Sequence, residues 1–285
     1  MTETRSADAT ATTPALKYFA IWSFLIPFFV IFLFPFAVMI STSLKTNQEV
    51  YRQPPRFIPD VIAFSNYRDV WTDVSLAVYF RNSLIIGLGT AVLALFLAVP
   101  AAYALARFRF RFRQIYLFML LIIQMFSPII IILALFKVVS TYHMLNSLTT
   151  LIVINAAFGL SYAVWLLTGC FQAIPAEIEE AAMMDGTSRL RAILVMTLPL
   201  SWPGIVAAAI FTFMQAWNEF LFALTFISDE NKTPITVGLF HFIGHFQVQW
   251  NYLMAASLIT TVIVLVLFMT VQKQLTRGML AGGIK

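Results

Sequence analysis

Six long apolar stretches, separated by shorter polar segments, dominate the pattern of hydrophobic and polar positions along this chain. Each is about 20 residues or longer, which is enough for a helix to cross the roughly 30 Å hydrocarbon core of a bilayer. They are apolar on every face, whereas strands of a membrane barrel alternate in polarity. The pattern predicts an all-α polytopic membrane protein with six transmembrane helices. The predicted spans are residues 18–40, 82–105, 115–136, 148–171, 204–227 and 253–272.

The composition agrees with a membrane environment. Of 285 residues, 60% are hydrophobic and 11% charged, and the mean hydropathy is +0.86, well above what a soluble domain shows. The net charge of +5 does not indicate nucleic-acid binding, because no basic stripe with interleaved aromatic residues lies on a long polar segment. Cys170 is the one cysteine, so the chain has no internal disulfide.

The chain begins with a polar segment, residues 1–17, that is rich in Thr, Ala and Ser. Such a composition buries little apolar surface, and we expect this tail to be disordered. The apolar stretch that follows is too long for a cleavable signal peptide and lacks a small-residue cleavage site, so we interpret it as an anchor. Residues 18–285 are then predicted to form one membrane domain.

The connection between the second and third spans carries the clearest indication of orientation. Arg107, Arg109, Arg111 and Arg113 fall within seven residues, alternating with Phe, and positively charged short loops lie on the cytoplasmic side. Both termini and the segment 172–203 are therefore predicted to be cytoplasmic. An amphipathic strand or a patch for lipid phosphates is an alternative interpretation of the same residues and leaves the orientation unchanged.

Segment 172–203 has the make-up of a helical hairpin. Pro175 suits a first helical position, acidic residues follow at the positive helix start, and Gly186 supplies a left-handed stop. Thr187 or Ser188 can cap a second helix, which prolines break near residue 199.

One face of the first hairpin helix is predicted to contact another surface. It consists mostly of small side chains, namely Ile178, Ala181, Ala182 and Asp185. Small side chains allow a second surface to approach the backbone closely. The alternative is a solvated loop in which Glu180-Ala181-Ala182 occurs by chance.

Polar residues within the predicted spans are candidates for a transport pathway, because each is unfavourable in lipid and tends to face protein or water. In the fifth span a polar and aromatic face combines Gln215, Asn218 and Glu219 with two Phe residues. Gln124 and Asn155 from other spans can add to the same cavity. Interhelical hydrogen bonding is the alternative for each of these residues taken singly.

A metal site is not predicted. His241 and His245 are four residues apart, a spacing found in metal sites, but no third ligand lies nearby. We interpret them as interfacial polar residues.

The hairpin sequence Glu180-Ala181-Ala182-Met183-Met184-Asp185-Gly186, followed after nine residues by Met196-Thr197-Leu198-Pro199, resembles the signature of permease subunits of binding-protein-dependent ABC importers. Met196 replaces the usual isoleucine. Four further segments are similar to the carbohydrate branch, and to the second permease of maltose-type systems in particular. They are Asn82-Ser83, Ala102 to Phe108, Trp217 to Phe220 and Gly278 to Lys285. Phe112, at a commonly glycine position, and the absence of a proline after Ser257 depart from the family pattern.

The resemblance implies a type I ABC importer permease in a bacterial cytoplasmic (inner) membrane. Its implied partners are a second, different permease, two ATP-binding subunits and an extracytoplasmic solute-binding protein that delivers a carbohydrate. The implied ATPase-coupling residues are Glu180, Ala181, Ala182, Asp185, Gly186, Leu198 and Pro199, with Gly282 and Gly283 between the ATPase subunits. This chain has no G-x-x-x-x-G-K phosphate loop, so we expect ATP and Mg²⁺ to bind to partner subunits and this chain not to be an enzyme.

Two other functions are compatible with a helical membrane protein. A self-contained secondary transporter or channel needs a charged coupling site and commonly has a duplicated set of spans, but Glu219 is the one acidic residue inside a predicted span. A membrane-embedded enzyme needs a nucleophile with its base, or a metal cluster, at a common depth.

Overall fold

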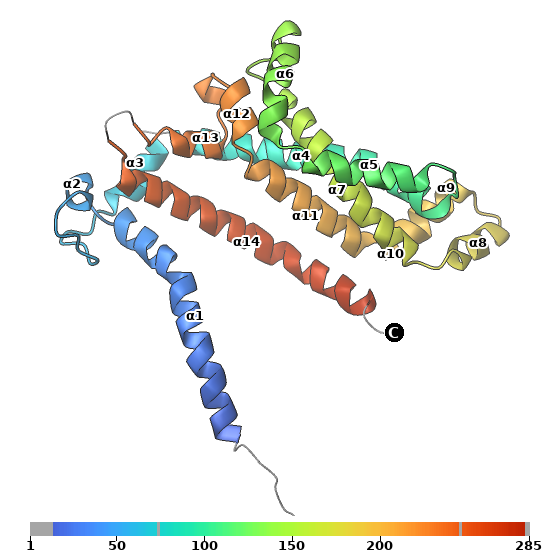
Figure 1. Ribbon diagram of the computed structural model, residues 1–285, viewed down its shortest axis with the longest axis horizontal. Helices are drawn as coiled ribbons and strands as arrows, with labels where there is room; N and C mark the ends of the chain where they lie inside the picture. Colours follow the sequence, from blue (N-terminus) through green and yellow to red (C-terminus); the bar gives the residue numbers. More distant parts are fainter. Residues whose placement is uncertain (1–13, 73–74, 245–246, 283–285) are drawn as a thin grey trace, which may run out of the picture.

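The computed structural model describes residues 14–72, 75–244 and 247–282, and these residues contain helices but no named strand. An isolated antiparallel bridge joins Ile243 and Val248. Figure 1 shows a bundle of long helices with short helices at both ends. The elements in chain order are α1 (Pro14–Ser43), α2 (Asn47–Val50), α3 (Ser65–Thr72), α4 (Leu76–Arg107), α5 (Arg113–Met125), α6 (Pro128–Thr141), α7 (Leu148–Gln172), α8 (Glu177–Met184), α9 (Arg189–Ala192), the π-helix η1 (Ile193–Thr197), α10 (Leu198–Leu200), α11 (Trp202–Trp217), α12 (Leu221–Phe226), the 3₁₀ turn η2 (Glu230–Lys232), α13 (Ile235–Phe240) and α14 (Trp250–Gly282).

Three helices of the described chain are each long and apolar enough to cross a membrane: α1, α4 and α7. Two bent pairs, α5 with α6 and α9–α10 with α11, raise the number to five when each pair is taken as one span. The sixth predicted span lies within α14, whose described apolar part is Trp250–Val266. The predicted all-α polytopic membrane class is confirmed, and the number of spans stays a prediction.

The predicted span 115–136 is not one straight helix. α5 and α6 meet at 92°, and the linking residues Phe126 and Ser127 are extended, with ψ of 124° and 129°. Pro128 is the first residue of α6. Its ring excludes the α conformation from the preceding residue and it has no N–H to continue the helical ladder, so the helix breaks there.

The predicted span 204–227 is also interrupted. α11 ends at Trp217 and α12 begins at Leu221. On the other side of α11 the chain bends by 74° between Leu200 and Trp202, where Pro199 and Pro203 occupy the first turns of α10 and α11. This agrees with the helix break predicted near residue 199.

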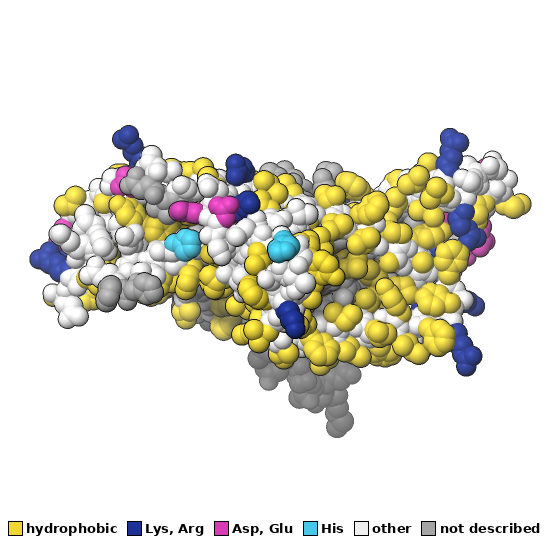
Figure 2. Space-filling view, turned by 90° about the horizontal axis from the view of Figure 1, so that it is seen from above, with side chains coloured by type: hydrophobic (Ala, Val, Ile, Leu, Met, Phe, Trp, Pro, Cys, Tyr) yellow, Lys and Arg dark blue, Asp and Glu magenta, His cyan; other side chains and the backbone are white. Residues whose placement is uncertain are grey.

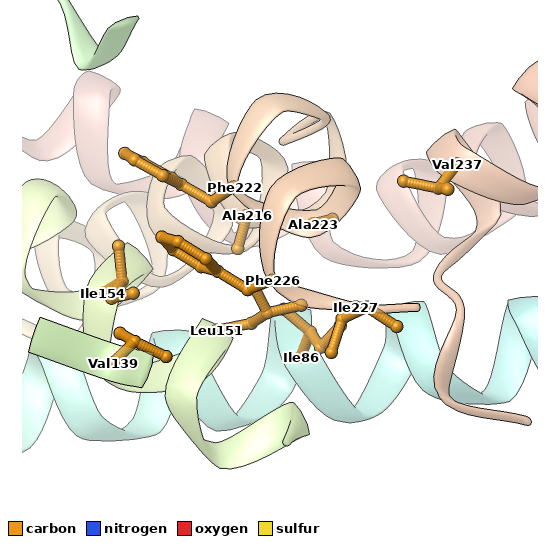
Figure 3. Packing of buried hydrophobic residues seen from close by; sticks show 10 residues of the cluster. All are labelled: Ile86, Val139, Leu151, Ile154, Ala216, Phe222, Ala223, Phe226, Ile227 and Val237. Carbon is orange, nitrogen blue, oxygen red and sulfur yellow. The ribbon is translucent and has the colours of Figure 1, made fainter. Parts of the chain in front are cut away.

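The centre of the bundle is a close packing of α4, α7 and α11. Small fully buried residues on the three helices, Ala98, Ala102, Ala163 and Ala208, let the backbones approach one another around Leu167. A second cluster places α12 over α4 and α7. Figure 3 shows the rings of Phe222 and Phe226 beside Ile154, with Val139 of α6 below them.

α1 departs from the rest of the bundle. In Figure 1 it diverges from α14, against which its carboxyl end lies. Phe24 and Ile31 are 75% and 74% exposed. Figure 2 shows hydrophobic side chains covering much of the surface between two ends where charged groups gather. Such surface is stable in contact with lipid or another apolar chain.

Two glycines test the packing around α4. A Cβ added at Gly238 in α13 would lie 2.2 Å from Cδ2 of Tyr79, whose side chain is 1% exposed and has little room to move. Gly238→Ala is expected to destabilise the protein by about 1–3 kcal/mol through overpacking. The measurement is thermal unfolding in detergent.

Gly169 in α7 is the matched control, because a Cβ there meets nothing within 4 Å. Gly169→Ala is expected to stabilise the helix by about 0.5–1 kcal/mol through lower backbone entropy in the unfolded chain. Equal unfolding temperatures for the two variants would contradict the close contact at Tyr79.

Candidate functional site

The predicted hairpin is present and projects from one end of the bundle. Figure 1 shows α8 and α9 at the end opposite α2 and α3. Gly186 has a φ of 86°, as its predicted role as a left-handed stop requires. The Thr187 hydroxyl donates to Ala182 O at 2.6 Å, and Ser188 Oγ accepts from Arg191 N and caps α9. Of the two predicted caps, Ser188 therefore holds that position.

Three of the four residues of the predicted contact face of α8 are exposed, namely Ile178, Ala181 and Asp185. The fourth, Ala182, is 6% exposed and packs inwards. Glu180 and Met184 are exposed as well, Met184 to 89%, and the contact role of the face stays a prediction. Leu198 is half-buried against the core and Pro199 is exposed.

Glu179, which the sequence analysis did not select, is the best-connected residue of the hairpin. Its Oε2 accepts from Tyr103 Oη at 2.6 Å. Its Oε1 accepts from Arg107 Nε and from Thr197 Oγ1, both at 2.8 Å. Arg107 Nη1 also donates to Ile174 O at 3.0 Å. The carboxylate thus joins the end of α4 to both helical arms of the hairpin.

The Glu179 carboxylate and the Arg107 guanidinium form a buried ion pair, with side chains 8% and 12% exposed. Arg107 Nη2 lies 2.8 Å from Oε1 without hydrogen-bond alignment, so this contact is charge–charge only. Burial by itself raises the pKa of Glu179. The hydrogen bonds from Tyr103, Arg107 and Thr197 and the charge of Arg107 outweigh burial and hold that pKa below its ordinary value of 4.5.

The sequence contained one indication of this site. Tyr103 and Arg107 are four residues apart at the end of an apolar span, so a donor pair lies on one helix face. From the sequence, Arg107 is interpreted as one of the positive charges that set the orientation in the membrane. Which of the neighbouring acids Glu179 and Glu180 meets that pair depends on how the hairpin folds back.

Glu219, predicted to line a pathway, has a structural role in this fold. Its two carboxylate oxygens accept from Phe222 N at 2.7 Å and Ala223 N at 3.0 Å. It thereby satisfies the first backbone donors of α12, which have no partner within that helix. This capping explains how the chain interrupts its helix next to Trp217 with few unsatisfied groups.

The other predicted pathway residues are distributed among different surroundings. Asn155 is 2% exposed and donates to Leu151 O within its own helix. Gln124 is exposed near the end of α5. Gln215 is half-buried next to Gly159 on α7. Among the described residues no hydrogen bond links the five predicted side chains to one another, and their common role stays a prediction.

Asn218 lines a groove between α11, α13 and α14. Its amide donates to Met214 O at 2.8 Å. The groove has a volume of about 480 Å³ and includes the hydroxyl residues Thr236, Ser257 and Thr260. Asn218 is therefore the predicted pathway residue that borders a groove, whose mostly apolar lining carries a few hydroxyl groups.

Three residues named in the sequence analysis lie outside the described structure or at its end. Gly283 and His245 lie outside the described residues, and Gly282 is the last residue of α14. Within the described chain no group of three or more His, Cys, Asp and Glu residues is arranged to hold a metal ion.

Comparison with known families identifies the hairpin-bearing bundle. Residues 94–280, more than half of the chain, match the family described as binding-protein-dependent transport system inner membrane component. The chain belongs to this family. The matched region of this family of ABC transporter permeases includes the hairpin, the Glu179 contacts and the capped α12, whereas Gly282 and Gly283 lie beyond it.

Curated relatives cover nearly the whole permease. The inner membrane ABC transporter permease protein YcjP of Escherichia coli is 36% identical over 90% of this chain and 93% of its own length. The sulfoquinovosyl glycerol transport system permease protein SmoH of Agrobacterium fabrum is 33% identical over 89% of each chain. The trehalose/maltose transport system permease protein MalG of Thermococcus litoralis is 32% identical over 90% and 92%.

A solved structure has the same fold. It is a chain in the crystal structure of a bacterial ABC transporter involved in the import of the acidic polysaccharide alginate, with a TM-score of 0.78 over 93% of this permease and 99% of that chain. The sequence identity is 22%, so this likeness concerns the fold. With the apolar helices and the inner membrane relatives, it places the permease in the cytoplasmic membrane as a multi-pass protein.

Removal of the Glu179 charge is expected to destabilise the permease. Glu179→Gln leaves Arg107 buried without its counter-charge, and breaking a buried pair costs about 3–5 kcal/mol. Glu180→Gln, at the exposed neighbouring position, is expected to change the unfolding free energy by less than about 0.5 kcal/mol. Thermal unfolding in detergent measures both, and similar losses would contradict the assigned roles.

The same comparison has a defined pH dependence. Because the folded pKa of Glu179 is lowered, its contribution is fully present above the ordinary value of 4.5 and is lost as the pH falls through the lowered pKa. The unfolding temperatures of the native protein and Glu179→Gln should differ by a constant amount from neutral pH down to about the ordinary pKa of 4.5. They should converge as the pH falls through the lowered pKa of Glu179 in the folded protein. A difference that disappears near neutral pH would contradict this.

The capping role of Glu219 is tested by two substitutions. Glu219→Ala leaves the N–H groups of Phe222 and Ala223 without an acceptor, which costs about 1–3 kcal/mol for buried polar groups. Glu219→Gln keeps one acceptor oxygen and is expected to lose less. Unfolding in detergent ranks the three proteins, and an alanine variant as stable as the native protein would exclude capping.

Proposed function

We propose that this chain is the transmembrane permease subunit of an ATP-driven ABC importer for a carbohydrate delivered by a solute-binding protein. The observation that carries the proposal is a projecting hairpin with exposed small residues. This hairpin lies within residues 94–280, which match the permease family. The relatives support the substrate class, because those named for a substrate act on sulfoquinovosyl glycerol, trehalose or maltose, and diacetylchitobiose.

The proposed assembly divides the work among several chains. A second, different permease completes the pathway, and two ATP-binding subunits hold ATP and Mg²⁺. An extracytoplasmic binding protein brings the carbohydrate. The absence of a phosphate loop in this sequence supports the assignment of ATP hydrolysis to the partners.

In this proposal the hairpin docks in a cleft of the ATPase. Glu180, Ala181 and Asp185 offer exposed polar and small groups, and Gly186 closes the helix. The exposed Met184 side chain adds an apolar contact. Ala182 and Leu198 support the hairpin from inside, Pro199 ends it, and Gly282 and Gly283 are proposed to extend between the ATPase subunits.

The proposed orientation rests on the arginines that follow Arg107. Arg109 and Arg111 lie in the connection from α4 to α5, and Arg113 begins α5; the positive-inside rule supports a cytoplasmic position for them. The hairpin and both termini are then cytoplasmic. The segments between α1 and α4 and between α12 and α14 face the binding protein.

The proposed pathway uses the accessible polar residues of α11 and its neighbours. Asn218 borders a groove with hydroxyl groups, and Gln215 is half-buried. Glu219 supports this region by capping α12. Gln124 and Asn155 are proposed as more distant supports. Movement of the hairpin by the ATPase alternates access to this pathway.

Reconstitution tests the proposal. The chain is expected to copurify with a permease and an ATPase, and liposomes containing the complex should accumulate a carbohydrate only with ATP and the binding protein. Uptake by this chain alone, without an ATPase, would indicate a secondary transporter or channel instead. A thermal-shift screen of the binding protein against sugars identifies the substrate.

Gly186 provides a sharper test of docking. Gly186→Val places a β-branched residue at a φ of 86°, which strains the backbone, and is expected to abolish uptake and ATPase coupling while membrane insertion persists. Gly186→Asn is the matched control, because Asn tolerates the left-handed conformation. Unchanged uptake by the valine variant would exclude a docking role for this turn.

A further inference from the structure

Polar side chains lie at both ends of α4, and each group fastens the helix to a different functional segment. At one end Tyr103 and Arg107 hold the Glu179 carboxylate of the hairpin. At the other end Asn82 and Ser83 hold the segment that leads from α12 to α13. We name these two sets of contacts the hairpin latch and the outer latch.

The outer latch consists of hydrogen bonds to backbone groups of residues 230–235. Asn82 Nδ2 donates to Asn231 O at 2.9 Å and to Thr233 O at 3.0 Å. Ser83 Oγ accepts from Ile235 N at 2.8 Å. Asn82 and Ser83 are 0% and 2% exposed, so water does not compete for these bonds.

The hairpin latch combines an ion pair with hydrogen bonds, whose geometry is directional. Tyr103 and Arg107 are one turn apart, and Arg107 reaches both Glu179 and Ile174 O, at the entrance of the hairpin. Thr197 adds the returning arm. If the hairpin rotated or slid against α4, the buried Glu179 carboxylate would lose hydrogen-bond donors, which is unfavourable.

α4 is one helix of 32 residues, about 48 Å long at 1.5 Å per residue, and about 39 Å of it lie between Asn82 and Arg107. Pro100 lies inside this part and removes one backbone hydrogen bond from the helix. The buried face, which includes Ala98 and Ala102 on either side of Pro100, packs against α7 and α11. This packing supports the helix across Pro100, so a single packed element joins the two latches.

We propose that α4 is the transmission element of this permease, and that Glu179 and Asn82 are the positioning residues that fasten it at its two ends. When the ATPase displaces the hairpin, α4 moves with it and moves the segment 230–235 on the side where the binding protein docks. This inference rests on the proposed function, because it supplies the route from the ATPase to the outer face.

The first test measures rigidity in the complete transporter reconstituted in nanodiscs. Spin labels replace Leu190 on α9 of the hairpin and Phe96 on α4, which are 69% and 75% exposed, in a Cys170→Ser background. Between the nucleotide-free and ATP-trapped states this distance is expected to change by less than about 2 Å, the size of local helix adjustments. A larger change in a complex that still transports would overturn the hairpin latch.

A second label pair tests the outer latch. Labels at Phe96 and Phe240 of α13, the latter 42% exposed, should likewise keep their distance within about 2 Å between the states. A pair at Leu190 and Phe24 of the diverging α1 serves as the reference that reports movement between the states. Independent movement of Phe240 and Phe96 would overturn transmission through α4.

Substitutions at each latch test the consequence for transport. Glu179→Gln and Asn82→Leu are each expected to lower the carbohydrate transported per ATP hydrolysed about tenfold, within the usual range of coupling between linked sites, while ATP hydrolysis continues. Tyr103→Phe and Arg107→Lys, which keep the shape and the charge respectively, should give smaller losses and remain informative when the stronger variants fail to assemble.

Matched controls separate this effect from general damage. Glu177→Gln removes a charge from the exposed first turn of α8, and Thr225→Val removes a hydroxyl bond within α12. Neither control joins two elements, and both should keep the native ratio. Native ratios in the latch variants would overturn the inference, whereas absence of any ATP-driven uptake by the native complex would overturn the proposed function itself.

Discussion

One buried ion pair, between Glu179 and Arg107, fastens the hairpin to α4. A hairpin of short helices has little core of its own, and its docking face stays exposed. The directional contacts that orient it come from a carboxylate that receives donors from Tyr103, Arg107 and Thr197. Such a pair adds little net stability when compared with apolar packing, but it allows only one arrangement of its partners. The fold therefore fixes the angle of a segment that works by being moved.

A second constraint is that a chain in lipid must satisfy its own backbone groups. The bundle interrupts helices in two places, next to Phe126 and next to Asn218. At the second break Glu219 supplies acceptors for the start of α12. The side chain of Asn155 satisfies its own donor in a similar way, on Leu151 O in the preceding turn of its helix. A polar residue inside a predicted span can therefore bond to the backbone of the bundle, and this weakens the inference from polarity to a transport pathway.

The sequence predicted helices better than contacts. Four of the apolar stretches fall within one helix, one falls on the bent pair of α5 and α6, and one covers α11 and α12, because apolar length alone decides what can cross a bilayer. The stop at Gly186 was also predictable, since the left-handed conformation favours glycine. The partner of Arg107 was not, because Glu179 and Glu180 differ by one position and only the tertiary arrangement decides which of them turns inwards.

The two short motifs at Asn82-Ser83 and at Tyr103 to Arg107 gain a physical meaning once they lie on one helix. Apolar packing between α4 and its neighbours tolerates small sliding movements, because it has no preferred direction. Hydrogen bonds at buried ends do not tolerate them, because a shift of about 1 Å already weakens the bond. A protein that must pass a movement through its membrane region therefore benefits from polar contacts at the ends of a helix and apolar contacts along it. α4 has this distribution, with Asn82 and Ser83 at one end, Tyr103 and Arg107 at the other, and alanines between them.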